Sequence, residues 1–215
     1  NPTTQVANDI TNLSYTTSGL DKGRKYYWKV VATDPSGSNT SSIMNFTFVM
    51  NPEWSYEAGT GTGSGYGQRV AFSSDGEYMV TGSKDNKVYL FSKNSSTPLW
   101  NYTTVNASVY GKIAISADGE YIVAGTDDDN KVYLFIKGSS TPLWSYTTGD
   151  NVISVAISAD GEHIVAGSYD NKVYLFNKSS STPLWTYTTG ADVNKVAISA
   201  NGEYIIAGGF DDKIH

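Results

Sequence analysis

Apolar and polar residues alternate in short runs along most of this chain, and polar turn residues separate the runs. Between residues 155 and 188 the alternation predicts four strands, at Val155–Ser158, His163–Ala166, Lys172–Phe176 and Leu184–Thr188. In the third of these, Val173 and Leu175 are predicted to face one side of the sheet, and Tyr174 and Phe176 the other. The pattern therefore predicts an antiparallel sheet of four strands.

The residues between these strands are typical of turns. Asp160-Gly161 predicts a tight hairpin turn in which both residues take positive φ, and Asp170-Asn171 marks the second turn. Pro183 stands at the start of the fourth strand, where its missing N–H does little harm. The loop between the third and fourth strands has the polar sequence Ser-Ser-Thr-Pro.

The four-strand pattern recurs along the chain from Trp54 onward. Its anchors return at intervals of about 41 to 46 residues, and they are Gly76, Gly119, Gly161 and Gly202, and Trp54, Trp100, Trp144 and Trp185. This period is typical of β-propellers, whose blades are four-stranded antiparallel sheets. We therefore expect an all-β chain with a partial β-propeller of about four blades, at about residues 54–99, 100–143, 144–184 and 185–215, the last one truncated.

The run from Val155 to Phe176 resembles the WD-repeat and YVTN-type propellers. In those families an apolar strand, a Ser-x-Asp-Gly turn, a strand ending in Ala-Gly and a Val-x-Leu-aromatic strand follow one another, and the resemblance covers residues 54–215. Phe91-Ser92, Phe135-Ile136 and Phe176-Asn177 stand where a strict WD repeat has Trp-Asp, and no Gly-His pair precedes the blades. The resemblance implies an aromatic core without the Asp-His network of WD repeats.

The strand Leu-Trp-x-Tyr-Thr-Thr is also similar to the tryptophan motif of quinoprotein propellers that bind pyrroloquinoline quinone. Those enzymes have acidic and amide ligands for calcium, and often a disulfide beside the cofactor. This chain has no Cys, which excludes disulfides and thiolate metal sites, and its Trp recurs in every repeat as a packing residue would. We therefore expect no cofactor.

Residues 1–50 lack the repeat and carry another signature. Six of them resemble the segment that leads into the sixth strand of a fibronectin type III domain, and they are Leu20, Gly23, Tyr26, Trp28, Val30 and Ala32. The resemblance implies the C-terminal half of such a sandwich, with a turn at Asp34–Gly37, a last strand at residues 43–49 and a corner formed by the Tyr26 hydroxyl. Pro52 lies in the predicted linker, so the propeller is expected over residues 51–215.

The charge balance argues against two classes of partner. The chain has 15 Lys and Arg against 21 Asp and Glu, a net charge of -6, and no basic run. Nucleic acid and anionic membrane surfaces are therefore not expected as partners. No apolar stretch approaches the roughly 20 residues of a membrane-spanning helix, so this segment is not expected to insert directly into a membrane.

Three features resemble catalytic or ligand sites but have simpler interpretations. The glycine-rich stretch at residues 58–68 precedes a strand, whereas a phosphate loop precedes a helix. Asp127, Asp128 and Asp129 are the kind of ligand that calcium requires, but a solvated turn is favoured. His163 occupies the position that Tyr holds in the other repeats, which indicates a partly packed strand residue. We expect no catalytic and no metal-binding residue, and hence no enzyme.

A ligand is expected on one face of the propeller. The loop after each Trp strand and the turn before each Lys-Val-Tyr strand vary among the repeats, whereas the other connections are nearly uniform. In propellers these two connections emerge on the same face, and variable loops on a rigid scaffold often bind ligands. The side chains predicted to contact a ligand are Tyr66, Lys84, Tyr110, Asp128, Tyr169 and Phe210. Random drift among duplicated repeats would give the same variation.

Together these observations predict a non-catalytic binding or scaffold module of a cell-surface or secreted protein, with a protein or glycan ligand. Seven Asn-x-Ser/Thr sequons agree with that location. Two alternatives stay open: an accessory propeller of a larger enzyme, either a quinoprotein dehydrogenase or a hydrolase, and an intracellular WD-type scaffold. We also expect that the chain is truncated at both ends, so that open blade edges would favour self-association.

Overall fold

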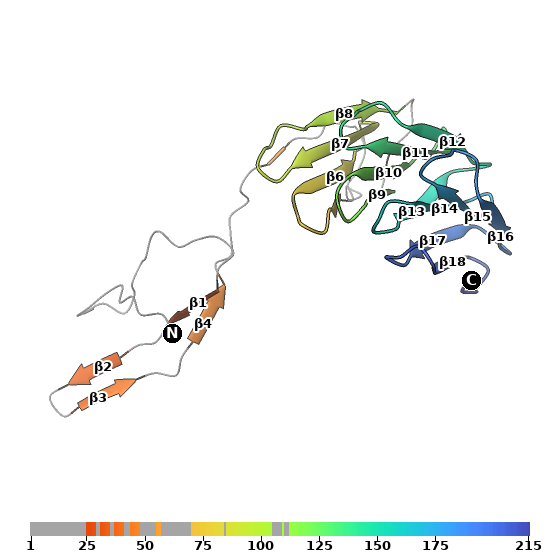
Figure 1. The fold of residues 1–215 in the computed structure, drawn as a ribbon. Helices are drawn as coiled ribbons and strands as arrows, with labels where there is room; N and C mark the ends of the chain where they lie inside the picture. Colours follow the sequence, from red (N-terminus) through yellow and green to blue (C-terminus); the bar gives the residue numbers. More distant parts are fainter. Residues whose placement is uncertain are drawn as a thin grey trace. The chain divides into compact units, whose positions relative to one another are not determined.

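The computed structural model describes residues 25–28, 31–34, 37–40, 44–47, 55–56, 70–83, 85–104, 109 and 112–215. The chain divides into two compact units, Asn1–Glu53 and Trp54–His215. We describe each unit by itself. The described parts consist of strands, turns and irregular segments (Figure 1).

The first unit contains two short antiparallel pairs of strands. β1 (Lys25–Trp28) pairs with β4 (Met44–Thr47), and β2 (Val31–Asp34) pairs with β3 (Gly37–Thr40). Asp34 lies opposite Gly37, so the turn predicted there connects two paired strands. The fibronectin type III assignment stays a prediction, and the corner proposed for the Tyr26 hydroxyl involves a side chain outside the described residues.

The second unit confirms the predicted fold class of a partial, all-β propeller. Three four-stranded antiparallel sheets follow one another, each with its strands in chain order. Their strands are β5 (Val70–Phe72), β6 (Tyr78–Gly82), β7 (Lys87–Ser92) and β8 (Trp100–Thr103); β9 (Ile113–Ile115), β10 (Tyr121–Gly125), β11 (Lys131–Ile136) and β12 (Trp144–Thr147); and β13 (Val152–Ile157), β14 (His163–Ser168), β15 (Lys172–Asn177) and β16 (Trp185–Thr188). A fourth sheet contains β17 (Val193–Ile198) and β18 (Ile205–Gly209), with one bridge from Gly208 to Ile214.

Three local predictions were wrong in detail. The first strand of the third blade begins at Val152 and not at Val155, because a β-bulge lets Val152 pair with Ser168. The Asp-Gly turn is also wider than predicted: the N–H of Ser158 donates to the carbonyl of His163, and within the turn only Gly161 has positive φ, at 72°. The fourth strand begins at Trp185, one residue later than predicted.

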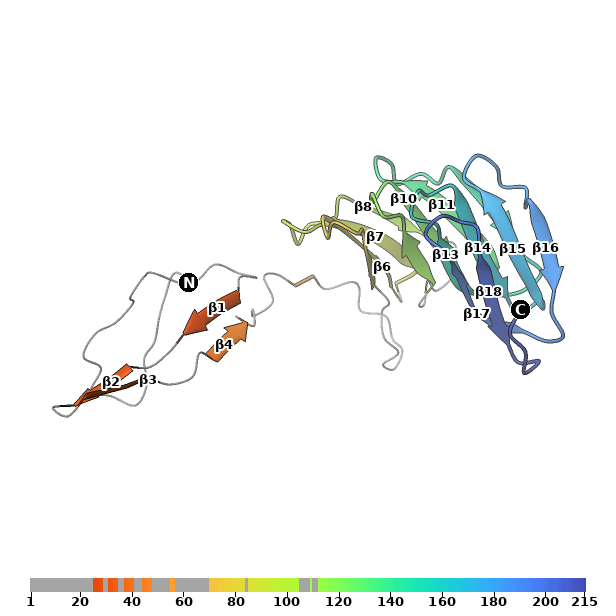
Figure 2. The same cartoon turned by 60° about the horizontal axis from the view of Figure 1, so that its bottom comes forward.

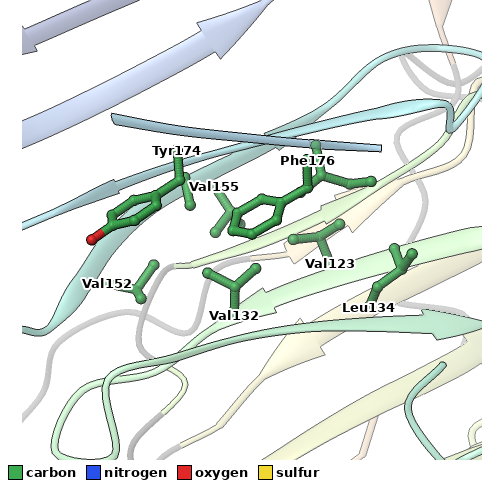
Figure 3. Packing of buried hydrophobic residues seen from close by; sticks show 9 residues of the cluster. Val123, Val132, Leu134, Val152, Val155, Tyr174 and Phe176 are labelled. Carbon is green, nitrogen blue, oxygen red and sulfur yellow. The ribbon is translucent and has the colours of Figure 1, made fainter. Parts of the chain in front are cut away.

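Successive blades pack face to face through alternating side chains. The first strands β5, β9, β13 and β17 lie side by side, and a Trp strand forms the opposite edge of each four-stranded sheet (Figures 1 and 2). In the central cluster, Val123, Val132 and Leu134 of one blade meet Val155 and other residues of the next (Figure 3). The period-two alternation therefore places both faces of a blade in contact with neighbours, which explains why these strands are apolar throughout.

Aromatic side chains connect each blade to the next in a repeated arrangement. The ring of Phe135 lies 5.4 Å from Trp100 and 5.1 Å from Tyr102 of the preceding blade. Phe176 has the corresponding distances of 5.3 Å and 5.2 Å to Trp144 and Tyr146. The indole N–H of Trp100 donates to the Lys137 carbonyl (2.7 Å), and that of Trp144 to the Lys178 carbonyl (2.9 Å). The repeated Trp is therefore a packing residue between blades, as the sequence predicted. These indole bonds connect residues of adjacent blades.

The glycine of the Asp-Gly turn has a second role at the contact between blades. Gly119 has φ 72°, and a Cβ added to it would lie 2.6 Å from a ring carbon of Tyr78 in the preceding blade. Gly161 meets Tyr121 in the same way, and Gly202 meets His163. His163 is therefore a half-buried packing residue, as predicted. Gly76 has φ 70°, but no atom of the described residues lies within 4 Å of its added Cβ.

This difference predicts unequal effects of two otherwise matched substitutions. Gly76→Ala should lower the free energy of unfolding by about 1 to 2 kcal/mol, because Ala is strained at positive φ. Gly119→Ala carries the same strain and also displaces the Tyr78 ring, so we expect a further loss of about 1 to 3 kcal/mol. Urea denaturation followed by Trp fluorescence measures both. Equal losses would show that the contact between ring and glycine has no energetic weight.

Candidate ligand-binding face

The loop after each Trp strand and the turn before each third strand lie against each other. The N–H of Gly149 donates to Asp170 Oδ2 (2.8 Å), and the N–H of Gly190 donates to Asp211 Oδ2 (2.9 Å). The N–H of Thr148 donates to the carbonyl of Asn130 (2.8 Å). The two variable connections therefore emerge on the same face, as predicted. We call this surface the loop face, and it comprises residues 126–130, 148–151, 168–171, 189–192 and 209–212.

An aspartate at one position of each repeat holds the loop face together. Tyr133 Oη donates to Asp129 Oδ2 at 2.8 Å, and Tyr174 donates to Asp170 in the same way. The equivalent pair Tyr89 and Asp85 is in the first blade. We call this arrangement the Tyr–Asp clasp. In two repeats the aspartate also accepts a backbone N–H from the loop after the Trp strand, so it connects a turn, a strand and a loop.

The fourth repeat has His215 in place of the clasp tyrosine. His215 Nε2 lies 2.8 Å from Asp211 Oδ2, and this hydrogen bond lowers the pKa of Asp211 to about 2. Asp211 is therefore the equivalent of Asp170. Sequence reasoning missed the clasp, although its signal is present: an Asp precedes Tyr or His by four positions in all four repeats.

The residue just before each clasp aspartate differs from repeat to repeat. These residues are Lys84, Asp128, Tyr169 and Phe210. The backbone N–H of Tyr169 donates to the Asn151 carbonyl (3.0 Å), and that of Phe210 to the Asp192 carbonyl (3.0 Å). The N–H of Asp128 donates to the Asn151 side chain at 3.0 Å. The main chain at this position is therefore held while the side chain differs from blade to blade.

These side chains are accessible to different degrees. Phe210 is 62% exposed, Asp128 is exposed and Tyr169 is half-buried. Four of the predicted contact residues thus hold the same position in the sequence of the repeat, and the structure describes three of them. Lys84, Tyr66 and Tyr110 lie outside the described residues. Ligand contact itself stays a prediction for all six residues.

The three consecutive aspartates of the second blade have separate partners. Asp127 forms an ion pair with Lys112, a buried lysine whose pKa is lowered by burial and raised in part by Asp127. Asp129 belongs to the clasp and also accepts a hydrogen bond from Thr126, and Asp128 is exposed. Within the described part of the chain, no group of three or more acidic or histidine side chains is placed to hold a metal ion.

The opposite face is uniform among the repeats and internally paired. Lys137 Nζ lies 3.2 Å from Glu120 and 4.6 Å from the ring centre of Tyr78. Lys178 pairs with Glu162 and lies 4.9 Å from the ring centre of Tyr121. The ion pairs lie within one blade, whereas the contacts with the tyrosine rings join neighbouring blades. Among the residues described, no helix is long and apolar enough to cross a membrane.

The Tyr–Asp clasp predicts that the folded protein loses stability at alkaline pH. Burial, together with the hydrogen bond to aspartate, raises the pKa of Tyr89, Tyr133 and Tyr174 above the usual value of about 10. The folded protein keeps these hydroxyls neutral, whereas the unfolded chain ionises them above about pH 10. The stabilisation is therefore complete below about pH 10 and is lost as the pH rises further. The urea concentration at the midpoint of unfolding should fall as the pH rises from about 9 to about 11. In the Tyr174→Phe variant this fall with pH should be smaller. An unchanged slope in that variant would contradict the assignment.

The fold and this face define a class of protein: a β-propeller-type repeat protein whose blades pack through aromatic residues and present variable turns on one face. The chain belongs to the family described as outer membrane protein assembly factor BamB, whose model matches residues 28–210. The match supports the quinoprotein-like part of the resemblance. It does not support the WD-repeat, YVTN or fibronectin type III parts, and it begins inside the segment with the fibronectin-like signature. A comparison with curated proteins found no match.

Proposed function

We propose that the repeat unit is a non-catalytic binding module of a cell-surface or secreted protein, and that it binds a protein or glycan through the loop face. The observation that carries this proposal is the position before the clasp aspartate. The main-chain N–H there donates a hydrogen bond to a residue of the loop after a Trp strand in each of three repeats, while the side chains are Asp128, Tyr169 and Phe210. A fixed frame with different exposed side chains is typical of binding surfaces.

The chemistry of this position favours recognition over catalysis. Exposed aromatic rings offer a large contact area at a low entropic cost, and the neighbouring Asp128 adds a hydrogen-bond acceptor. A protein segment or a sugar ring suits such a mixture of aromatic and acidic groups. The matching family is described as an assembly factor, which supports a role in protein interactions for this chain as well.

The test uses the full chain against an array of glycans and a displayed library of random peptides. Phe210→Ser and Tyr169→Ser should each weaken binding to any selected ligand at least about tenfold. Leu143→Ser is the matched control, because Leu143 is half exposed but belongs to the loop between the third and fourth strands. The Leu143→Ser variant should bind the selected ligand with the same affinity as the unmodified chain.

Three outcomes would contradict the proposal. The first is no selected ligand from either library, and the second is an equal loss in the Leu143 control. The third is stoichiometric uptake of pyrroloquinoline quinone with a cofactor absorbance band, which would favour an enzyme. The location is tested on intact cells with the tagged protein: external protease should cleave it, and protection would refute a surface location.

A further inference from the structure

The seven Asn-x-Ser/Thr sequons lie outside the residues that define the loop face. Such a sequence can carry an N-linked glycan in an exported protein, provided that its Asn is accessible at the surface. The structure describes the side-chain surroundings of three of these asparagines, Asn94, Asn101 and Asn177. The three differ in exposure, in hydrogen bonding and in the conformation of their main chain, so the structure can distinguish between them.

Asn94 lies in the turn that follows β7. The N–H of Ser95 donates to the carbonyl of Ser92 (3.3 Å), which closes a β-turn. The N–H of Asn94 itself donates to Ser92 Oγ (3.3 Å), so the main chain is held. The side chain of Asn94 is exposed, and in the described part of the chain it has no hydrogen-bond partner. Its amide nitrogen Nδ2 is therefore open to modification.

The same turn recurs in the second blade, where the N–H of Ser139 donates to the carbonyl of Ile136 (3.0 Å). Gly138 has the place of Asn94 there, and a Cβ added to it would have no described atom within 4 Å. This blade has a described blade on each side. Ser179, at the same place in the third blade, is also exposed. Open space at this position is therefore a property of the turn itself.

The other two asparagines are less suitable. Asn177 is half-buried at the end of β15, and its Oδ1 accepts hydrogen bonds from the N–H (3.0 Å) and the hydroxyl (2.6 Å) of Ser179. The two side chains that define that sequon are thus bonded to each other. Asn101 is exposed but lies within β8, where it pairs with Tyr89 of β7. Of the three, Asn94 alone combines an exposed side chain with a main chain outside the strands.

The turn of Asn94 lies on the face opposite the loop face. The N–H of Lys93 donates to the carbonyl of Glu77 (2.8 Å), and this bond holds the turn beside the Asp-Gly turn of the same blade. The strands of the blade separate this end from the loop face (Figure 1). A glycan on Asn94 therefore leaves the loop face accessible to a ligand.

We propose that Asn94 is an N-glycosylation site. The inference rests on the proposed location at the cell surface or outside the cell, since this modification is typical of exported proteins. The co-reactant is an oligosaccharide linked to a polyprenyl phosphate or diphosphate. A bond forms between Asn94 Nδ2 and C1 of the first sugar, and the bond between C1 and the phosphate oxygen breaks. The lipid phosphate leaves, and a base of the transferase takes the amide proton. Ser96 supplies the hydroxyl of the sequon.

The test is mass spectrometry of the protein isolated from the cells that produce it. Fragmentation by electron transfer keeps a glycan attached and identifies the residue that carries it. Proteolytic cleavage after Trp100 separates Asn94 from Asn101. The expected result is a glycan on Asn94 in most molecules and none on Asn177.

Two variants test the acceptor sequence. Asn94→Gln removes the acceptor, and Ser96→Ala keeps Asn94 but removes the hydroxyl, so each should lower the intact mass by one glycan. Asn177→Gln is the matched control and should leave the glycan mass unchanged. Asn94 is exposed and Ser96 is half-buried, so both variants should fold, which circular dichroism verifies.

The outcomes separate this inference from the proposed function. Unmodified Asn94 in a protein that external protease cleaves on intact cells would overturn the inference and leave the proposed location standing. Unmodified Asn94 in a protein that is protected from protease would overturn both. A glycan that persists in the Ser96→Ala variant, or one that is lost in the Asn177→Gln variant, would also overturn the assignment of Asn94.

Discussion

Replacing Phe135 with alanine is expected to lower the free energy of unfolding by about 3 to 5 kcal/mol. Phe135 is fully buried and contacts the Trp100 and Tyr102 rings of the preceding blade. The substitution therefore removes buried area and leaves a cavity at a junction between two blades. Urea denaturation should show a lower midpoint.

Phe72→Ala is the matched control, because Phe72 is more than half exposed on the first blade. Its expected loss is within about 0.5 kcal/mol. If the two substitutions had equal effects, the junctions between blades would not be the main source of stability. Because each repeat contacts only its neighbours, a weakened junction should also make the unfolding transition broader.

Replacing Asp170 with alanine is expected to cost about 2 to 4 kcal/mol, the second largest effect. Asp170 accepts hydrogen bonds from the Tyr174 hydroxyl, from the N–H of Gly149 and from the N–H of Lys172. Its loss leaves the buried Tyr174 hydroxyl without its acceptor, and a charged acceptor makes these bonds stronger than neutral ones. Urea denaturation measures the effect.

A double-mutant cycle with Tyr174→Phe separates the clasp from other roles of Asp170. The coupling energy should be about 1 to 3 kcal/mol, because the two side chains are in direct contact. Asp128→Asn is the matched control, since Asp128 is exposed and precedes the clasp aspartate of its own repeat. A coupling energy near zero would mean that the hydrogen bond is not stabilising.

The clasp also connects stability to the proposed function. It fixes the turn that carries Tyr169 and the equivalent turn that carries Phe210. Asp170→Ala should therefore lower the affinity for a ligand of the loop face more than Leu143→Ser does, even under conditions where both variants are folded. Binding at such a surface is tighter when its side chains lose less conformational entropy on association.

The repeat, the blade and most strand positions could be predicted from the sequence. Alternation with period two is a local property, so Val173 and Leu175 could be assigned to one face and Tyr174 and Phe176 to the other. The turn glycines could also be predicted, because a turn that needs positive φ favours glycine, and Gly161 has such a φ. The start of β13 could not, because it depends on a bulge and on pairing with Ser168 in the next strand.

The sequence by itself determined which residues form blades, which side chains of a strand share a face and which connections vary. Only the tertiary structure decided that Trp144 bonds to the backbone of Lys178 in the next blade, and that Gly149 bonds to the clasp at Asp170. It also decided that Gly76 and Gly119, which both follow Asp and have φ of 70° and 72°, differ in which described side chains cover them. The reason is physical: dihedral preferences and alternation act between neighbours in the chain, whereas these contacts depend on how one twisted sheet stacks on the next.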